Sequence, residues 1–188
     1  MSEALEEMFL FGEEKMEKAV GQMKKEFASV RTGRANPGIL DKVIVEYYGA
    51  PTPIRQMAQV AVSEGTTLVI TPFDKSIMKE VEKAIIKAEL GVAPNNDGTC
   101  IRLNFPPLTE ERRRETAKDV KKFGEDAKVA IRNVRRDMVD DLKKIEKDEN
   151  LPEDTVKDKQ DQIQKLTDKY VGIVDSLVSE KEKEVMTV

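Results

Sequence analysis

The chain has 188 residues with a net charge of −4, enough for one domain or two small ones with a real core. With no histidine and only one cysteine, Cys100, it cannot form a histidine-dependent triad, an internal disulfide or a His/Cys zinc site. Because these catalytic and metal-binding residues are missing, we expect no enzyme, no cofactor and no metal site. The negative charge separately argues against a general nucleic-acid coat protein.

The first predicted element is a helix that ends near Val30. Its apolar residues recur at alternating steps of about three and four, which is typical of a helix with one buried edge. They are Leu5, Phe9, Gly12, Met16, Ala19 or Val20, Met23, Phe27 and Val30. The acidic start is unlike a targeting leader, and no run approaches the roughly 20 apolar residues of a membrane span. We therefore expect a cytoplasmic protein that does not contact a membrane.

Between Val30 and Phe105 the pattern changes to short strands rich in β-branched and aromatic residues, separated by Gly, Pro, Asn and Asp. One helix interrupts them, and Asn95–Gly98 is predicted to be a turn that leads into the last strand. The predicted strands are Val43–Tyr48, Ile54–Val62, Thr67–Thr71 and Thr99–Phe105, and the helix is Ser76–Leu90. Cys100 is interpreted as a core residue of the last strand. Tyr47 and Tyr48 are the only pair suited to base stacking, and strand alternation would expose just one of them.

A long helix from about Thr109 to Lys147 is the most informative segment. At about 100° per residue, one edge collects apolar residues: Ala117, Val120, Gly124, Ala127, Ile131, Val134, Met138, Leu142 and Ile145. On the opposite side we predict a row of cations, here called the cation stripe: Arg114, Lys118, Lys121, Lys128, Arg132, Arg135 and Arg136. A solvated face would explain the stripe on its own. Its arginines favour phosphate binding, because the planar guanidinium matches phosphate better than an ammonium does.

The charge is unevenly distributed along the chain. Residues 1–30 contain 4 basic and 7 acidic residues, a net −3, whereas residues 111–144 contain 12 basic and 8 acidic residues, a net +4. Such a separation favours a local, oriented binding face over diffuse attraction.

The third long helix follows Pro152 and has its own apolar edge, from Val156 to Leu177. Three such helices predict a three-helix bundle. Gly12 and Gly124 fall on inner faces, which favours close helix approach, although a simple weak spot remains an alternative.

The predicted fold is therefore α+β with two domains. Residues 1–30 and 106–188 form an elongated three-helix bundle, and residues 31–105 form a small β/α/β domain inserted between its first two helices. The chain crosses between the domains near Arg31-Thr32-Gly33-Arg34 and Asn104-Phe105-Pro106-Pro107. These segments are interpreted as a hinge or, alternatively, as a rigid elbow.

Five segments closely resemble the bacterial ribosome recycling factor family, in its order and spacing across nearly the whole chain. They are Arg31–Pro37, Val45–Pro53, Pro106–Arg113, Val129–Asp137 and Gln164–Asp168.

The resemblance implies an L-shaped, roughly tRNA-sized monomer with a flexible hinge. It further implies binding to the post-termination ribosome, on the 50S subunit and its 23S rRNA, and splitting of that ribosome together with elongation factor G and GTP. By resemblance, Arg132 ranks first among the rRNA contacts, with Lys128, Arg135 and Arg136 beside it. Two rivals remain from the residues alone: a helical scaffold whose stripe binds an acidic protein, and a hydrolase.

Overall fold

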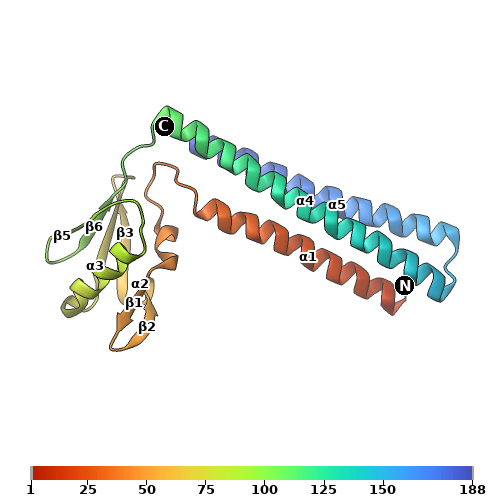
Figure 1. Cartoon of the computed structure of the whole chain (residues 1–188), viewed down its shortest axis with the longest axis horizontal. Coiled ribbons are helices and arrows are strands. Elements are labelled where there is room, and N and C mark those ends of the chain that lie inside the picture. Colours follow the sequence, from red (N-terminus) through yellow and green to blue (C-terminus); the bar gives the residue numbers. More distant parts are fainter. Residues whose placement is uncertain (1, 188) are drawn as a thin grey trace. The chain divides into compact units, whose positions relative to one another are not determined.

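The computed structural model describes residues 2–187, which form two compact units (Figure 1). One unit contains the residues up to Phe27 and those from Arg114 onward, and the other spans Ala28–Arg113. The first is a three-helix bundle and the second a small α+β domain inserted between its first two helices, which confirms the predicted fold class. Residues 28–30 and 106–113, which we assigned to the bundle, group with the smaller unit.

The bundle consists of α1 (Glu3–Ala28), α4 (Glu110–Glu149) and α5 (Glu153–Met186). In Figure 1, α4 runs antiparallel to both α1 and α5. The apolar edge predicted for α4 is the buried one: Val120, Gly124, Ala127, Ile131, Met138 and Leu142 are buried, and Ala117, Val134 and Ile145 are half-buried. The turn between α4 and α5 contains Asn150 at φ +50°, a conformation that asparagine tolerates better than most residues.

Two glycines let the bundle helices approach each other closely. A Cβ on Gly12 would collide with the Met138 side chain, and a Cβ on Gly124 would collide with Cγ2 of Val178. Both glycines are buried, which confirms close approach as their role.

A polar contact joins α5 to α1 at the edge of the core. Tyr170 is 5% exposed, and its hydroxyl lies 3.1 Å from a carboxylate oxygen of Glu13 and 3.1 Å from one of Glu17. Burial, together with the two neighbouring carboxylates, raises the pKa of the Tyr170 phenol above its ordinary value.

The smaller unit has two antiparallel sheets. One is a hairpin of β1 (Ile44–Tyr47) and β2 (Ala50–Pro53). The other has the order β3-β4-β6-β5, formed by β3 (Ala58–Ser63), β4 (Thr67–Pro72), β5 (Pro94–Asn96) and β6 (Ile101–Asn104). The remaining elements are η1 (Pro37–Lys42), α2 (Ile54–Met57), η2 (Lys75–Ile77) and α3 (Met78–Lys87). A single core joins both sheets and α3, with Leu40, Val45, Leu68, Val81 and Ile101 almost fully buried.

The strand predicted at Ile54–Val62 is wrong in its first half, where Ile54–Met57 forms the helical turn α2. Ile54 and Met57 are both buried, and a spacing of three places them on one face of a helix but on opposite faces of a strand.

Two strands differ from the prediction near the chain's turns. We did not predict β2, because Pro51 and Pro53 are unusual in strands; both are tolerated here on an edge strand. Asn95 and Asn96, predicted to be in a turn, lie in β5.

The last strand begins later than predicted, because the amides of Thr99 and Cys100 donate to Oδ1 of Asp97, each at 2.9 Å, instead of joining the sheet. Cys100 is buried as expected, but it lies before β6 and not within it. Its thiol donates to Oδ2 of Asp97 at 3.3 Å.

Candidate nucleic-acid interface

The cation stripe lies on α4, whose start is defined by local hydrogen bonds. The amide of Arg112 donates to the hydroxyl of Thr109 at 3.2 Å, and the amide of Arg113 donates to the Thr109 carbonyl at 2.9 Å. Glu110 and Glu111 place negative charge in the first turn, where the helix dipole favours it. The helix then continues for 40 residues, so the spacing of its cations is fixed by a regular backbone.

Most of the stripe is accessible from solvent. Six of its members are exposed: Arg114, Lys118, Lys121, Arg132, Arg135 and Arg136. Within residues 2–187, five of these six, all but Arg114, make no ion pair with a carboxylate. An exposed guanidinium without an intramolecular partner remains available to an external anion.

Lys128 differs from the other stripe residues. Its side chain is only 17% exposed, and its ammonium lies 2.5 Å from Asp175 on α5 and 3.3 Å from Glu125 on α4. The hydrogen bond to Asp175 is the main reason that the pKa of Lys128 is raised. Lys128 therefore joins α4 to α5, and the structure engages it in the bundle and not in an open binding face.

The direction of the stripe also differs from the prediction. At about 100° per residue, Lys121, Arg132 and Arg136 lie roughly 100–160° from Val120 around the helix. The contact of Lys128 with Asp175 shows that this side adjoins α5. The stripe therefore flanks the buried edge along the α5 side and does not lie directly opposite it.

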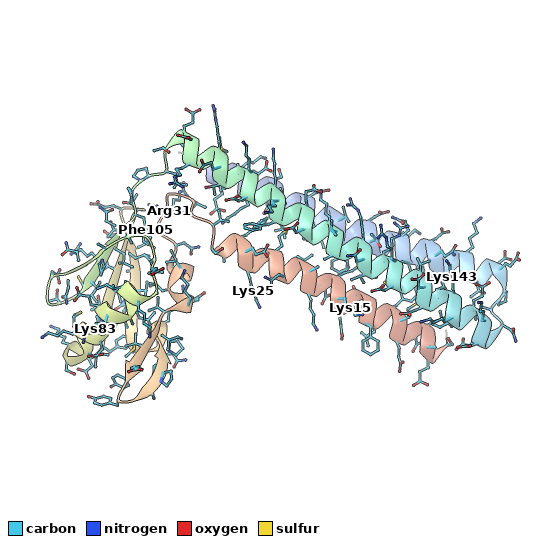
Figure 2. The ribbon with its side chains drawn as sticks, in the orientation of Figure 1. Lys15, Lys25, Arg31, Lys83, Phe105 and Lys143 are labelled. Atoms are coloured by element: carbon cyan, nitrogen blue, oxygen red, sulfur yellow. The ribbon has the colours of Figure 1, made fainter. Side chains whose placement is uncertain are left out.

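Another side of α4 carries exposed carboxylates. Asp119, Asp126 and Asp137 are exposed at roughly 240–260° from Val120, on the side toward α1, where Asp126 lies beside Glu26. Figure 2 shows Lys15 and Lys25 of α1 pointing away from α4 and α5. The carboxylates on this side are mixed with the exposed cation Lys144, whereas cations predominate along the stripe, so the stripe suits a polyanion better.

The two tyrosines of the smaller unit behave as alternation predicts. Tyr47 is partly buried against the core, and Tyr48 is 81% exposed at the tip of the β1–β2 hairpin. Their rings are 4.5 Å apart between centroids in an edge-to-face arrangement.

The two predicted crossing segments contact each other. The guanidinium Nη2 of Arg31 donates to the carbonyl of Pro106 at 3.3 Å, and Figure 2 shows Arg31 and Phe105 close together. Gly33 has φ +81°, and a Cβ there would lie 3.3 Å from the amide nitrogen of Leu108. Thr32 is half-buried, and Arg34 and Pro107 are exposed.

Two of the predicted hinge residues are fixed to the sheet of the smaller unit, one within a strand and one just after it. Asn104 is the last residue of β6 and pairs with Thr67, and Phe105 is 3% exposed, with its amide donating to the Thr66 carbonyl at 2.8 Å. Regular structure ends at Asn104, and Phe105 remains bonded to the residue before β4, so the second crossing leaves the sheet at Pro106.

Other kinds of site were sought in residues 2–187. No group of three or more His, Cys, Asp or Glu side chains in that range could hold a metal ion. None of the helices described is both long and apolar enough to cross a membrane.

A family model described as ribosome recycling factor matches residues 23–186, which is most of the chain. The chain belongs to the ribosome recycling factor family. Curated ribosome-recycling factors from Geobacillus kaustophilus, Bacillus licheniformis and Bacillus subtilis are 58%, 57% and 55% identical to it over 175 residues, covering 93% of this chain and 95% of each relative. This confirms the resemblance seen in the five sequence segments.

Solved structures agree with the family assignment. A solution structure of a ribosome recycling factor matches all of this chain and all of its own, with a TM-score of 0.84 and 41% identity. A second match, with a TM-score of 0.67 and 40% identity over 97% of this chain and 99% of the other, is the Thermus thermophilus ribosome recycling factor. It was placed with the Escherichia coli elongation factor G on the E. coli post-termination complex. Members of this family are translation factors and not enzymes, which confirms the prediction that the chain catalyses no reaction and removes the hydrolase rival.

Sequence reasoning missed the role of Lys128. Its place in the helical repeat, about 40° from Gly124, puts it at the boundary with the next helix. That signal was present, but only the structure supplies the partner, Asp175, from 47 residues further along the chain.

Proposed function

We propose that this chain recycles ribosomes after termination. It binds the large subunit and, together with elongation factor G and GTP, separates the ribosome into subunits that can be used again. Family membership supports this function, and so does the Thermus thermophilus relative, which was placed with elongation factor G on a post-termination complex. The proposed place of action is the cytoplasm.

The proposed docking site is the exposed part of the cation stripe on 23S rRNA. The observation that carries it is the row of Lys118, Lys121, Arg132 and Arg136 along one side of a 40-residue helix. Positions 118, 121, 132 and 136 are spaced so that their cations follow the helix axis, as a phosphate backbone requires. Arg135 and Arg114 extend the same side, and Lys128 supports the site by fixing α4 to α5.

The proposed mechanism is mechanical. The bundle holds the RNA, and the smaller unit receives a push from the GTPase and passes it on through the crossing segments, which act as a hinge. The chain supplies no chemistry of its own, because hydrolysis of GTP by the partner provides the free energy.

The test is a splitting assay on purified post-termination ribosomes. Light scattering should fall as subunits separate when the chain, elongation factor G and GTP are all present, and it should stay constant when any one is omitted. Splitting by the chain alone would contradict the mechanism.

A second measurement separates RNA docking from the remaining rival, a scaffold that binds an acidic protein. Binding to large subunits should weaken steeply as the salt concentration is raised. Binding to RNA releases counterions from the phosphates, and a higher salt concentration opposes this release. Equal binding to large subunits and to an acidic protein of similar charge would favour the scaffold.

A further inference from the structure

The β1–β2 hairpin of the smaller unit ends in an unusual turn. Strand β1 stops at Tyr47 and β2 starts at Ala50, so Tyr48 and Gly49 form the whole connection, with φ values of +49° and +80°. Two-residue turns with positive φ at both positions prefer Asn, Asp or Gly first, because a larger side chain is strained there. A tyrosine at this position costs stability that an asparagine would not.

Tyr48 differs from the other left-handed residues in the kind of side chain that it exposes. Within residues 2–187, the non-glycine residues with positive φ are Tyr48, Glu64, Glu89 and Asn150, and only Tyr48 has a large aromatic side chain. The Tyr48 ring is also 81% exposed, so its strain is not repaid by burial in the chain itself. A strained and exposed aromatic residue points to a role outside the chain.

The surface next to the ring is apolar and nearly uncharged. Ile44 pairs with Pro53, and Glu46 pairs with Pro51, so these four exposed residues share one face of the hairpin and extend from the turn. We call Ile44, Glu46, Tyr48, Pro51 and Pro53 the hairpin face. Residues 44–53 contain no lysine or arginine, and their one charge is the carboxylate of Glu46.

This composition decides between a nucleic acid and a protein as the partner. An RNA-binding surface needs cations that pair with the phosphates, whereas the only charge of this hairpin is the carboxylate of Glu46. The hairpin is therefore unsuited to RNA. Tyrosine surrounded by apolar residues is typical of the central contacts of protein interfaces. The prolines of β2 remove two backbone N–H donors, so the partner cannot extend this sheet along β2 and must bind the side chains.

We infer that the hairpin face is a docking site for a protein partner in the post-termination complex, with the Tyr48 ring as its anchor. The partner has an apolar pocket of the size of a phenol ring, edged by a lysine or arginine that pairs with Glu46. Figure 1 places the tip of this hairpin at the end of the unit opposite the crossing segments, where a push has its longest lever arm about them. The inference rests on the proposed function and adds the contact through which the smaller unit receives the push.

The decisive variant is Tyr48→Asn, which removes the ring and supplies a residue suited to the turn. We expect Tm to rise by roughly 2 °C and large-subunit binding to stay unchanged. We expect the rate of ribosome splitting with elongation factor G and GTP to fall at least tenfold, as for the loss of an interface anchor. Tyr48→Phe should split ribosomes at the original rate, because the ring is retained.

The matched control is Glu64→Asn, in the β3–β4 turn. Glu64 is also exposed and left-handed, with φ +54°, so this change relieves similar backbone strain without touching the hairpin face. Splitting should be unaffected. A full splitting rate in Tyr48→Asn would overturn the inference. If the unchanged protein did not bind large subunits, the proposed function would be overturned instead.

Photocrosslinking identifies the class of partner. A benzoylphenylalanine at position 48 should crosslink to a protein when the chain is bound to post-termination ribosomes with elongation factor G, and the same group at position 64 should not. A crosslink to ribosomal RNA, or a protein yield no higher than at position 64, would refute protein docking. Glu46→Lys should slow splitting, because it places a cation against the lysine or arginine proposed at the edge of the partner's pocket. An equal or faster rate would exclude that lysine or arginine.

Discussion

The cations of α4 differ in what surrounds them, and this separates structural from binding roles. Lys128 has two carboxylates within 3.3 Å and little exposure, so its charge is already neutralised inside the bundle. Arg132 is one helical turn further along, exposed, and makes no ion pair with any residue in the described range 2–187. Two residues that look equivalent in the sequence therefore differ in whether RNA can reach their charge.

Arg132→Ala should reduce affinity for the large subunit without affecting the fold. Loss of one charge-assisted contact should weaken binding roughly tenfold and reduce the slope of log affinity against log salt by about one. Tm should not change, because the side chain is exposed and packs against no core. Titration of labelled protein with large subunits at several salt concentrations measures both effects.

The control for this change is Lys144→Ala, which removes an exposed cation of the same helix about 120° around the axis from Arg132. Its affinity and salt slope should match the unchanged protein. Equal losses in both variants would mean that net charge, and not the stripe, determines binding.

At the scale of helices, glycine marks where the bundle is tightest. A Cβ on Gly124 meets Val178, whose branched side chain has few alternative rotamers, whereas a Cβ on Gly172 of α5 meets nothing within 4 Å. Gly124→Ala should therefore lower the free energy of unfolding by about 1 kcal/mol, because overpacking exceeds the gain in helix propensity. Gly172→Ala should raise the free energy of unfolding by up to about 1 kcal/mol.

Denaturant unfolding of both variants measures the two changes. If both variants were more stable than the unchanged protein, α4 and α5 would be able to move apart at little cost in free energy.

The contact between α1 and α5 predicts a response to alkaline pH. Because the pKa of Tyr170 is raised in the folded chain, the unfolded chain releases this phenol proton first, near pH 10. The folded state then binds more protons, so the stabilisation from Tyr170 is present below about pH 10 and decreases as pH rises further.

Tyr170→Phe should remove this contribution. The variant should be about 1 kcal/mol less stable than the unchanged protein at pH 7, and the difference should shrink between about pH 10 and 11. Unfolding by denaturant at each pH provides the comparison. A constant difference between Tyr170→Phe and the unchanged protein across this range would show that the hydroxyl is not the titrating group.

The helices were predictable because their signal repeats over many turns. Nine apolar positions of α4 agree on one buried edge, so an error at one of them would not change the assignment. The strands are only three to six residues long, and one local interaction can shift a boundary. The Asp97 carboxylate accepts a hydrogen bond from the Cys100 amide, so β6 begins later than predicted. The prolines of β2 made its sequence unlike that of a strand, so this edge strand was not predicted. The cation stripe was predictable as a row, but the ion pair of Lys128 depends on α5 and could not be read from α4 alone.

At the scale of the whole molecule, the proposed lever needs two properties. Each unit must be stiff, and the bundle helices of 26, 40 and 34 residues with a continuous core meet that need for one of them. The crossings must also transmit torque while they bend. Their short length and the hydrogen bond from Arg31 to Pro106 favour transmission, because the two segments are tied to each other.

Lengthening the crossings should therefore uncouple binding from splitting. Two glycines inserted between Val30 and Arg31, together with two between Pro106 and Pro107, add flexible chain without removing any residue. Affinity for the large subunit should be unchanged, because the stripe is untouched, and Tm should fall only slightly, since loop length costs little. The rate of splitting with elongation factor G and GTP should drop strongly, because a flexible connection absorbs the push. Two serines inserted after the exposed Gly91, between α3 and β5, control for insertion itself. Normal splitting by the doubly lengthened chain would show that the units act independently and that no force passes through the crossings.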